Sequence, residues 1–532
     1  MDSQASADLK EDYFCETRER CAIVATDMQT IIHFFHSLSV PESIGLGTCV
    51  HVVLTFTVIV HVLNKPRDAR TSLLWIAGAL AFPFVGPILY VFFGINTIPR
   101  KAFKKLTSDR TFFASWTGGQ GRHEEEVAPV FHRSQFQVQL PATSVAGQLS
   151  HLLAHYAPDF PLLSGNEVRI FERAEMALDE MIEAMRQAQE HIHLSTFIFN
   201  DDVVGMRVME VLVERAKAGV CVRVLYDSFG SALASLRLFF WRYRRIPNLH
   251  LVGFSQANVF KRKFQFSLRN HRKIIVIDGK VAFIGGLNFH DVYLSKGGTP
   301  GVIDYHFRVQ GPVVSELQYT FLRDWYYMTE DTAETLLCAN HFPKPECAGS
   351  MVACLQNSSP TSDELHASLN AFFAASNMAH KQILIVTPYL VPPAALVLAL
   401  QQAAFRGVDV KILVPAVNNH PTIRYASQAL YTRLLMAGVR IFERRTPFIH
   451  AKAMVIDGEV AFVGSANMDS RSLILNYETN LAVFDSTFVE RLRLVMQDDF
   501  EQADEMDYAQ WRLRSKVRRL IENFFNLFHL IA

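Results

Sequence analysis

A stretch of sequence that occurs twice constrains the fold of this chain more than any other feature. Residues 271–288 read HRKIIVIDGKVAFIGGLN and residues 450–467 read HAKAMVIDGEVAFVGSAN, with 11 identical positions in a gapless alignment. Upstream, a helix end, a glycine cap and an apolar strand also recur, at 216–225 and 404–413. The order strand, helix, strand and a further strand with the histidine favours an α/β fold. We therefore predict two pseudo-twofold-related halves, each a mixed sheet flanked by helices.

Each copy carries residues that suit a phosphate. Histidine and lysine stand at i and i+2, on one face of a strand, and an asparagine ends the motif. Lysine and asparagine can hold phosphate oxygens, while histidine can attack or protonate. Two such sets predict a shared site in which one histidine attacks phosphorus and the other protonates the leaving oxygen. The Asp-Gly pairs at 278–279 and 457–458 indicate hairpin turns, and the small residues near each motif end suggest close approach of a ligand.

The N-terminal part has two long runs without charged residues, 44–63 and 71–97, the second of which contains Pro83 and Pro87. About 20 apolar residues are enough for a helix to cross a bilayer, so we predict a transmembrane hairpin at 44–97, kinked at its prolines. A signal peptide or a buried core hairpin are the alternatives. Lysine and arginine number seven on the side of the main body and three in the link, which favours a cytoplasmic body.

The remaining organisation follows from these features. The predicted segments are an N-terminal segment at 1–43 with an interfacial or core helix at 22–40, the hairpin at 44–97, a linker at 98–139, a first half at 140–335, a second half at 336–510 with an irregular junction at 330–360, and a basic, aromatic tail at 511–532.

Composition narrows the class of partner. Lys and Arg number 52, as do Asp and Glu, and this zero net charge argues against a general nucleic-acid binder. Basic and aromatic residues nevertheless gather at 237–245, 260–273 and 512–530. This pattern favours anionic lipid headgroups, with nucleic acid or a plain solvated face as alternatives.

Cysteine and histidine usage gives no metal or disulfide framework. The seven cysteines are scattered without a CxxC pair, although one bridge among Cys338, Cys347 and Cys354 stays open. His151 and His155 have helical metal-ligand spacing but no evident carboxylate partner, so we interpret them as surface or interface residues.

The two copies match the HxKxxxxDxxxxxxG[GS]xN signature of the phospholipase D superfamily at every fixed position. The matching residues are His271, Lys273, Asp278, Gly285, Gly286, Asn288, His450, Lys452, Asp457, Gly464, Ser465 and Asn467. Within that superfamily, residues 45–515 resemble the bacterial cardiolipin synthases. The resemblance includes Trp75 and the stretches 83–90, 196–202, 270–273 and 464–472.

The resemblance implies phosphatidyl transfer from one phosphatidylglycerol to another, which gives cardiolipin and glycerol through a phosphohistidine without metal or cofactor. The alternative is a membrane-bound phospholipase D that releases phosphatidic acid. The implied setting is the inner membrane, with phosphatidylglycerol, cardiolipin and an anionic membrane surface as partners and no nucleic acid. The sequence leaves the oligomeric state open.

The resemblance also implies roles for individual residues. His271 is the expected nucleophile and His450 the general acid and then base, although the reverse assignment stays open. Four side chains are expected to hold phosphate oxygens and a serine to add a contact: Lys273, Lys452, Asn288, Asn467 and Ser465.

Downstream acids are expected to orient the two histidines. Glu478 is assigned to His271 and Asp304 to His450, so each pair crosses the pseudo-twofold axis. Asp278 and Asp457 belong to the catalytic motif but are expected to fix their turns and not to touch substrate.

Overall fold

The structure is a computed structural model that divides the chain into two compact units, Met1–Thr97 and Ile98–Ala532. It describes residues 46–64, 69–94, 98–116, 134–254, 269–295, 297–360 and 366–527. The helix predicted at 22–40 and most of the basic segment at 260–273 lie outside the described residues.

The smaller unit is built from short helices. They are α2 (Leu46–Leu63), α3 (Ala69–Ala81), α4 (Val85–Leu89) and the π-helix η1 (Tyr90–Gly94). Thr55 donates a hydrogen bond to the carbonyl of Ala79 at 3.2 Å, which ties α2 to α3. Gly86 permits close packing, since a Cβ there would lie 2.2 Å from the carbonyl oxygen of Gly78.

We predicted that the second uncharged run forms one kinked helix, and this prediction was wrong. Helix α3 ends at Ala81 and α4 begins at Val85, with Phe84 in a positive-φ conformation between them. Pro83 provides no backbone N–H, which favours a helix end at this point. Among the described residues, no helix combines the length and apolarity needed to cross a membrane. The spanning hairpin therefore stays a prediction.

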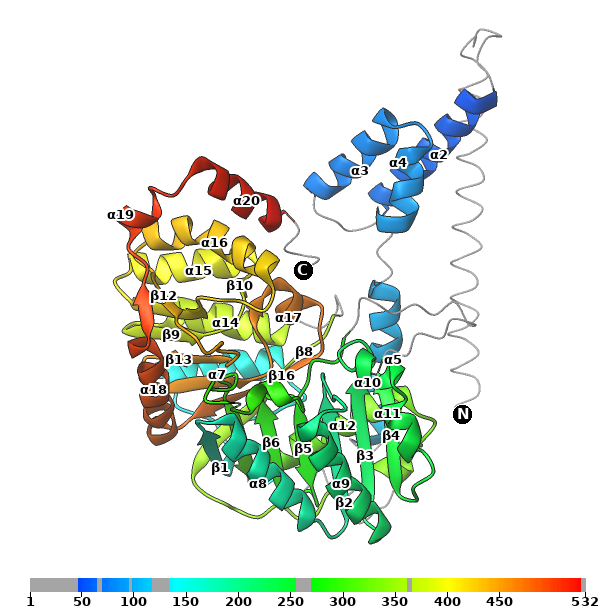
Figure 1. Cartoon of the computed structure of the whole chain (residues 1–532), viewed down its shortest axis with the longest axis vertical. Helices are drawn as coiled ribbons and strands as arrows, with labels where there is room; N and C mark the ends of the chain where they lie inside the picture. Colours follow the sequence, from blue (N-terminus) through cyan, green and yellow to red (C-terminus); the bar gives the residue numbers. More distant parts are fainter. Residues whose placement is uncertain are drawn as a thin grey trace. The chain divides into compact units, whose positions relative to one another are not determined.

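The larger unit contains a long mixed sheet whose two halves repeat each other (Figure 1). The strands of the first half are β1 (Leu163–Phe171), β2 (His191–Thr196), β3 (Cys221–Asp227), β4 (Leu249–Phe254), β5 (Ile274–Ile277), β6 (Val281–Gly285) and β7 (His306–Gln310). Those of the second half are β8 (Met351–Ser358), β9 (Gln382–Val386), β11 (Asp409–Pro415), β12 (Arg440–Arg444), β13 (Ala453–Ile456), β14 (Val460–Gly464) and β16 (Glu478–Phe484), with β17 (Ala503–Glu505) added at the edge.

Strand order demonstrates the internal symmetry. From the centre outward, the first half runs β1-β7-β6-β5-β2-β3-β4 and the second runs β8-β16-β14-β13-β9-β11-β12. The outer strands β2–β3–β4 and β9–β11–β12 pair in parallel, and the hairpins β5–β6 and β13–β14 are antiparallel. The halves meet where β1 pairs antiparallel with β8. The predicted mixed α/β architecture with matching halves is confirmed.

Helices cover the sheet between the strands. In the first half these are α8 (Ala174–Arg186), α9 (Val203–Lys217), α10 (Ala232–Leu236), α11 (Phe239–Tyr243), η3 (Asp291–Tyr293) and α12 (Val313–Met328). In the second half they are α14 (Ala367–Met378), α15 (Ala394–Phe405), α16 (Pro421–Met436), α17 (Ser470–Ile474), α18 (Ser486–Glu501), α19 (Tyr508–Trp511) and α20 (Lys516–Asn526). Helix α7 (Val145–Tyr156) packs on α14, and β10 (Leu390–Val391) pairs with β15 (Met468–Asp469).

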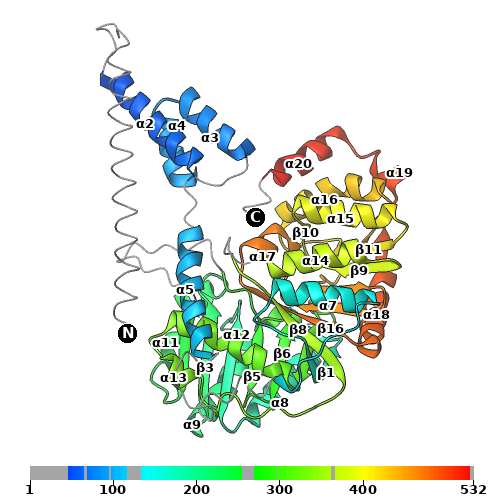
Figure 2. The same cartoon turned by 180° about the vertical axis from the view of Figure 1, so that it is seen from behind.

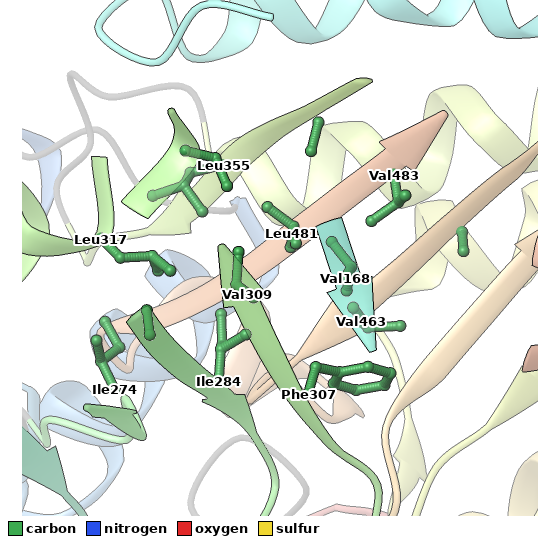
Figure 3. Packing of buried hydrophobic residues seen from close by; sticks show 14 of the residues in the cluster. Val168, Ile274, Ile284, Phe307, Val309, Leu317, Leu355, Val463, Leu481 and Val483 are labelled. Carbon is green, nitrogen blue, oxygen red and sulfur yellow. The ribbon is translucent and has the colours of Figure 1, made fainter. Parts of the chain in front are cut away.

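Alternation along the strands divides the core into layers. Ile274 and Ile284 point into a core that both halves share, together with Val463 and Leu481 from the second half (Figure 3). The intervening residues, such as Ile275, face the separate helical layer of their own half. The motif hairpins are thus buried on both faces, which fixes the segments that lead into them.

The segment predicted as a linker begins with a helix that belongs to the larger unit. Helix α5 (Ile98–Trp116) lies against α12, and Phe112 stacks on Tyr319 with ring centroids 5.6 Å apart (Figure 2). Lys105 on this helix is buried and forms ion pairs with Asp109 at 2.7 Å and Asp324 at 2.9 Å. Lys105 is therefore a core residue. It is one of the seven lysines and arginines that we counted on the side of the main body to predict the membrane topology.

The junction predicted as irregular contains ordered elements. Helix α13 (Ala333–Leu336) and strand β8 both lie within residues 330–360. Strand β8 pairs with β1 and β16 and so occupies the centre of the sheet.

Candidate active site

Both motif copies lead to one cavity in the larger unit. Each copy begins as an extended segment that precedes an antiparallel hairpin, β5–β6 or β13–β14. His271 and Asn288 from the first half and His450 and Asn467 from the second half all line a cavity of about 310 Å³. The fold therefore brings two imidazoles and two carboxamides from separate halves to a single site.

Each imidazole is hydrogen-bonded to a carboxylate of the opposite half. His271 Nδ1 lies 2.9 Å from Glu478 Oε1, and His450 Nδ1 lies 2.7 Å from Asp304 Oδ2. This is the crosswise pairing that we expected. An Nδ1–H that donates to a carboxylate leaves Nε2 with an available lone pair, so each carboxylate favours the tautomer that a nucleophile or general base needs. Lys452 Nζ also lies 2.8 Å from His450 Nδ1 and competes for that atom.

Backbone hydrogen bonds hold the same four residues in register. The N–H of His271 donates to the carbonyl of Tyr477 at 2.9 Å, and the N–H of His450 donates to the carbonyl of Ile303 at 2.7 Å. Each acceptor immediately precedes the carboxylate that bonds the ring. One strand segment thus positions both the backbone and the imidazole of the facing histidine.

The two motif lysines are buried beside the histidines. Lys273 Nζ donates to the carbonyl of His271 at 2.8 Å, and Lys452 Nζ donates to the carbonyl of His450. Burial, opposed by the charge of Glu478, lowers the pKa of Lys273 to about 7. Burial, opposed by Asp304, lowers the pKa of Lys452 to about 8. Both amines would therefore gain charge when an anion enters the cavity.

The two asparagines are anchored differently. Asn288 Oδ1 accepts from the N–H of Ile198 at 3.1 Å, and its Nδ2 donates to Tyr293 at 3.4 Å. Asn467 Nδ2 donates to the Ser472 hydroxyl at 3.2 Å. The Oδ1 atom of Asn467 is buried without a hydrogen-bond partner among the described residues. Both carboxamides are thus fixed at the cavity wall by residues that follow the motif.

The small residues at the motif ends accommodate protein groups, whereas we had expected them to admit a ligand. A Cβ at Gly286 would lie 2.0 Å from Asp304 Oδ1. At the matching position, the Ser465 hydroxyl donates to Glu478 Oε2 at 2.6 Å. Ser465 therefore contacts the orienting carboxylate, and its expected contact with a phosphate stays a prediction.

The two motif aspartates lie outside the cavity. Asp278 has positive φ and accepts from the backbone N–H groups of Gln189, Glu190 and His191, each at 2.8 Å. Asp457 accepts in the same way from the N–H groups of residues 380–382. Each carboxylate caps the start of the neighbouring strand, β2 or β9, so these residues support the sheet.

The two histidines differ in their electrostatic surroundings. Burial and the nearby cations, with Lys273 first, hold the pKa of His271 well below its usual range. Burial and Lys452 lower the pKa of His450 to about 4, while Asp304 acts in the opposite direction. His450 is therefore the ring that protonates more readily. Burial raises the pKa of Glu478 to about 7, against the charge of Lys273.

Sequence reasoning missed several residues of the site. Arg269, Arg471 and Tyr389 line the same cavity. Asp324 accepts a hydrogen bond from Asn270 Nδ2 at 3.2 Å and pairs with Arg272, and so holds the residues on both sides of the nucleophile candidate. For the two arginines the available signal was a difference in charge between the copies, since the second half has Phe448 at the position of Arg269 and the first half has Val292 at that of Arg471.

Other candidate groups lie apart from the cavity. His151 and His155 are exposed on α7. The five cysteines within the described residues are free thiols, so no bridge joins Cys338, Cys347 and Cys354. In that part of the chain, no group of three His, Cys, Asp or Glu side chains is arranged to hold a metal ion.

Comparisons with known proteins agree with this geometry. A family model described as cardiolipin synthase, PLD-like domain, matches residues 181–325 and 373–500. A second, described as phospholipase D-nuclease N-terminal, matches residues 53–94. A cardiolipin synthase of Geobacillus thermodenitrificans (strain NG80-2) is 31% identical over 96% of this chain and 98% of its own length. Another, from Geobacillus sp. (strain WCH70), is 33% identical over 91% and 93%.

A solved structure shares the fold. The crystal structure of phosphatidylserine synthase from Haemophilus influenzae Rd KW20 has a TM-score of 0.56 and 14% sequence identity. It covers 72% of this chain and 100% of its own. At this level of identity the likeness supports the arrangement of the two halves.

Proposed function

The chain belongs to the cardiolipin synthase family with phospholipase D-like domains, and from this premise we propose that its histidine pair transfers a phosphatidyl group in two steps. Cardiolipin synthesis is the activity of the family, and the chain is a phosphatidyltransferase of the phospholipase D type. The observation that carries the proposal is that two histidines line one cavity and that each is hydrogen-bonded to a carboxylate of the opposite half.

In the first step, His271 Nε2 attacks the phosphorus of one phosphatidylglycerol. The bond from phosphorus to the headgroup oxygen breaks, and His450 gives its Nε2 proton to that oxygen, so glycerol leaves. A phosphatidyl group is then bonded to His271.

In the second step, His450 takes the proton from a glycerol hydroxyl of a second phosphatidylglycerol. The resulting oxygen attacks phosphorus, the bond to His271 breaks, and cardiolipin forms. Water in place of that hydroxyl would give phosphatidic acid, the product of the alternative hydrolase.

Electrostatics support the assignment of His271 as nucleophile. A nucleophilic imidazole must be neutral, and the surrounding cations favour the neutral form of His271. A general acid must carry a proton, and Asp304 favours protonation of His450. Burial and Lys452 nevertheless lower the pKa of His450 to about 4, and the negative charge of a bound phosphodiester raises the pKa of both rings back toward its usual value.

Lysine and asparagine side chains are the proposed phosphate ligands. Lys273 and Lys452 supply positive charge from behind the histidines, and Asn288 and Asn467 line the cavity itself. A transition state that carries negative charge on its oxygens gains most from such fixed donors in a buried site.

The enzyme associates with a membrane through exposed apolar and basic residues near the cavity. Helix α20 exposes Val517, Leu520 and Phe524 at helical spacing. This helix packs on α16, which contributes Thr422 and Ile423 to the cavity wall. Such a helix suits the interface of an anionic bilayer.

A second apolar surface lies on the first half. Helices α10 and α11 and the turn between them expose Leu233, Leu236, Leu238 and Trp241, alongside several arginines. The exposed Phe229 links this surface to the cavity because it stacks on Arg269. Vesicle binding should therefore weaken with added salt and with loss of anionic lipid. Insensitivity to both changes would contradict this surface.

We further propose that residues 44–97 anchor the enzyme in the inner membrane and that the body is cytoplasmic. The uncharged runs and the match of residues 53–94 to an N-terminal family model support an anchor. With Lys105 removed from the count, six cations remain on the side of the body against three in the link, so the charge bias keeps its direction. A reporter fused after Ala532 should be active only in the cytoplasm; activity only outside it would reverse the topology.

Vesicles with labelled phosphatidylglycerol test the function directly. The proposal expects cardiolipin together with an equal amount of glycerol, and both should disappear in His271→Ala and His450→Ala. Phosphatidic acid as the main product would support the hydrolase, and turnover retained in either variant would overturn the mechanism.

A further inference from the structure

The cavity is not symmetric, although matching halves enclose it. Two residues before its motif histidine, the first half has Arg269 where the second half has Phe448. Four residues after its motif asparagine, the second half has Arg471 where the first half has Val292. Each half therefore carries one arginine at a place where the other half is apolar.

Hydrogen bonds show that these positions are equivalent in space. The carbonyl of Arg269 accepts from the N–H of Tyr477 at 3.0 Å, and the carbonyl of Phe448 accepts from the N–H of Ile303 at 2.9 Å. The residue after Val292 is Tyr293, which accepts from Asn288, while Ser472 follows Arg471 and accepts from Asn467. The pseudo-twofold axis thus relates Arg269 to Phe448 and Arg471 to Val292, and of these four residues the two arginines line the cavity.

The two guanidinium groups line the same cavity and are close enough to repel each other. The positive charge of Arg471 adds to burial in lowering the pKa of Arg269 to about 10. Arg269 lies over the ring of Phe229, 3.9 Å from its centroid, which fixes the plane of the guanidinium. Two like charges in a partly buried site are unfavourable unless an anion compensates them.

The carboxyls of Asp227 and Asp469 lie near the two arginines and act against the mutual repulsion, but burial raises the pKa of each acid to about 6. Within the described residues neither arginine forms an ion pair with them, and Arg269 Nε, Arg471 Nε and Arg471 Nη2 are buried without hydrogen-bond partners. Arginine presents its N–H groups as a planar fork that matches phosphate oxygens. The unpaired donors therefore define a site for a phosphate group that enters with a substrate.

Resting on the proposed function, we propose that Arg269 and Arg471 form a subsite for the phosphodiester of the acceptor phosphatidylglycerol. The reacting phosphate is already provided with Lys273 and Lys452. The acceptor brings a second phosphodiester, three carbons away from the hydroxyl that attacks, and cardiolipin contains both. The subsite thus recognises the group that distinguishes an acceptor lipid from glycerol or water.

The subsite lies on the His271 side of the cavity. The charges of both arginines lower the pKa of His271, whereas His450 responds to Lys452 and Lys273. The three-carbon headgroup of the acceptor is flexible, so its hydroxyl can lie beside His450 while its phosphate lies on the other side of the reacting phosphorus. An acceptor held in this way excludes water from the phosphohistidine, which favours transfer over hydrolysis.

Two reactions of the full-length enzyme separate the subsite from the rest of the machinery. Cardiolipin formation requires a phosphatidylglycerol acceptor. Exchange of labelled glycerol into phosphatidylglycerol uses the same phosphohistidine but has an uncharged acceptor. Arg471→Val, which copies the matching position of the other half, should lower cardiolipin formation about tenfold to a hundredfold, as expected for loss of a charge-assisted contact, and leave exchange within about threefold.

Three further variants complete the test. Arg269→Gln should change the ratio of the two rates in the same direction, and Arg471→Lys should restore part of it because the charge returns. Arg186→Val, which removes an exposed cation on α8 outside the cavity lining, should leave both rates unchanged. If folded Arg471→Val and Arg269→Gln lose both reactions equally, the arginines bind the donor phosphate and not the acceptor. If both rates stay at the wild-type level, the subsite does not exist. Absence of cardiolipin with the wild-type enzyme would instead overturn the proposed function.

Discussion

Glu478→Gln should abolish most activity without weakening the fold. In the structure, Glu478 accepts from His271 Nδ1, from the Ser465 hydroxyl at 2.6 Å and from Asn476 Nδ2 at 3.2 Å. A glutamine has one acceptor oxygen and one NH₂ group in place of two acceptor oxygens. Its NH₂ group must therefore face at least one of these three donors. If it faces His271, the proton moves to Nε2 and the attacking lone pair is lost.

The size of the effect follows from the role of the carboxylate. An acid-to-amide change beside a catalytic histidine lowers the turnover rate about 10⁴-fold in the serine protease triad. Because His271 is also polarised by several cations, we expect a loss of about 10³ to 10⁴-fold, or about 4 to 5.5 kcal/mol of transition-state stabilisation. Glu478→Asp keeps the charge and should retain more activity than the glutamine variant.

Stability should change in the opposite direction. Burial raises the pKa of Glu478 from 4.5 to about 7, so the folded state binds the proton more tightly than the unfolded state. This carboxyl therefore lowers stability progressively as pH rises from 4.5 to about 7, by up to about 3 kcal/mol. Glu478→Gln removes that contribution, so its melting temperature above pH 7 should equal or exceed that of the wild-type enzyme.

Labelled phosphatidylglycerol in mixed micelles measures the rate, and a thermal melt at several pH values measures stability. Asp304→Asn serves as the matched variant for the other histidine, where the same loss of orientation is expected. Activity of Glu478→Gln within about threefold of wild type would refute the orienting role, given the losses that such a role implies. A large drop in its melting temperature above pH 7 would refute the electrostatic reasoning.

Three other predictions follow from charged side chains with well-defined partners. Lys105→Met should lower the free energy of unfolding by about 3 to 5 kcal/mol, because it leaves Asp109 buried without its nearest cation. The double variant Lys105→Met with Asp109→Leu should regain most of this loss in denaturant titrations, and additive effects of the two changes would contradict the reasoning. Asp278→Ala should lower the free energy of unfolding by about 2 kcal/mol through loss of three amide contacts, with turnover per folded molecule unchanged, and a selective loss of turnover would assign it to the chemistry. Sulfate binding near pH 8 should be accompanied by proton uptake, because an anion raises the lowered pKa values of Lys273 and Lys452. Calorimetry in buffers of different ionisation enthalpy measures this uptake, and binding without uptake would contradict the prediction.

The duplicated motif made much of the site predictable. Histidine, lysine and asparagine at fixed spacing require a strand and a hairpin, and two copies require that these elements meet. The similar positions of Asp304 and Glu478 after each motif, together with the resemblance to relatives that have acids there, led to the expected crosswise pairs. The aspartate of each motif was predictable as a turn residue because Asp-Gly favours the positive φ that both adopt.

Features that depend on packing between distant segments were not predictable. Lys105 looked like a membrane-flanking cation because its partner Asp324 lies far away in the sequence and on another helix. The hydrogen bond from the Ser465 hydroxyl to Glu478 was not predicted, because it joins residues on the neighbouring strands β14 and β16. Arg269 and Arg471 meet only through the pseudo-twofold arrangement, so neither motif copy alone indicates a second anion site.

A trapped covalent intermediate tests the central claim most directly. A phosphatidyl donor with p-nitrophenol as leaving group needs no general acid, so His450→Gln should complete the first step and stall before the second. The account predicts one equivalent of p-nitrophenol and a phosphatidyl group on His271, identified by peptide mass spectrometry, and no burst from His271→Gln. A burst from His271→Gln with the phosphatidyl group on His450 would contradict the account and exchange the roles of the two histidines.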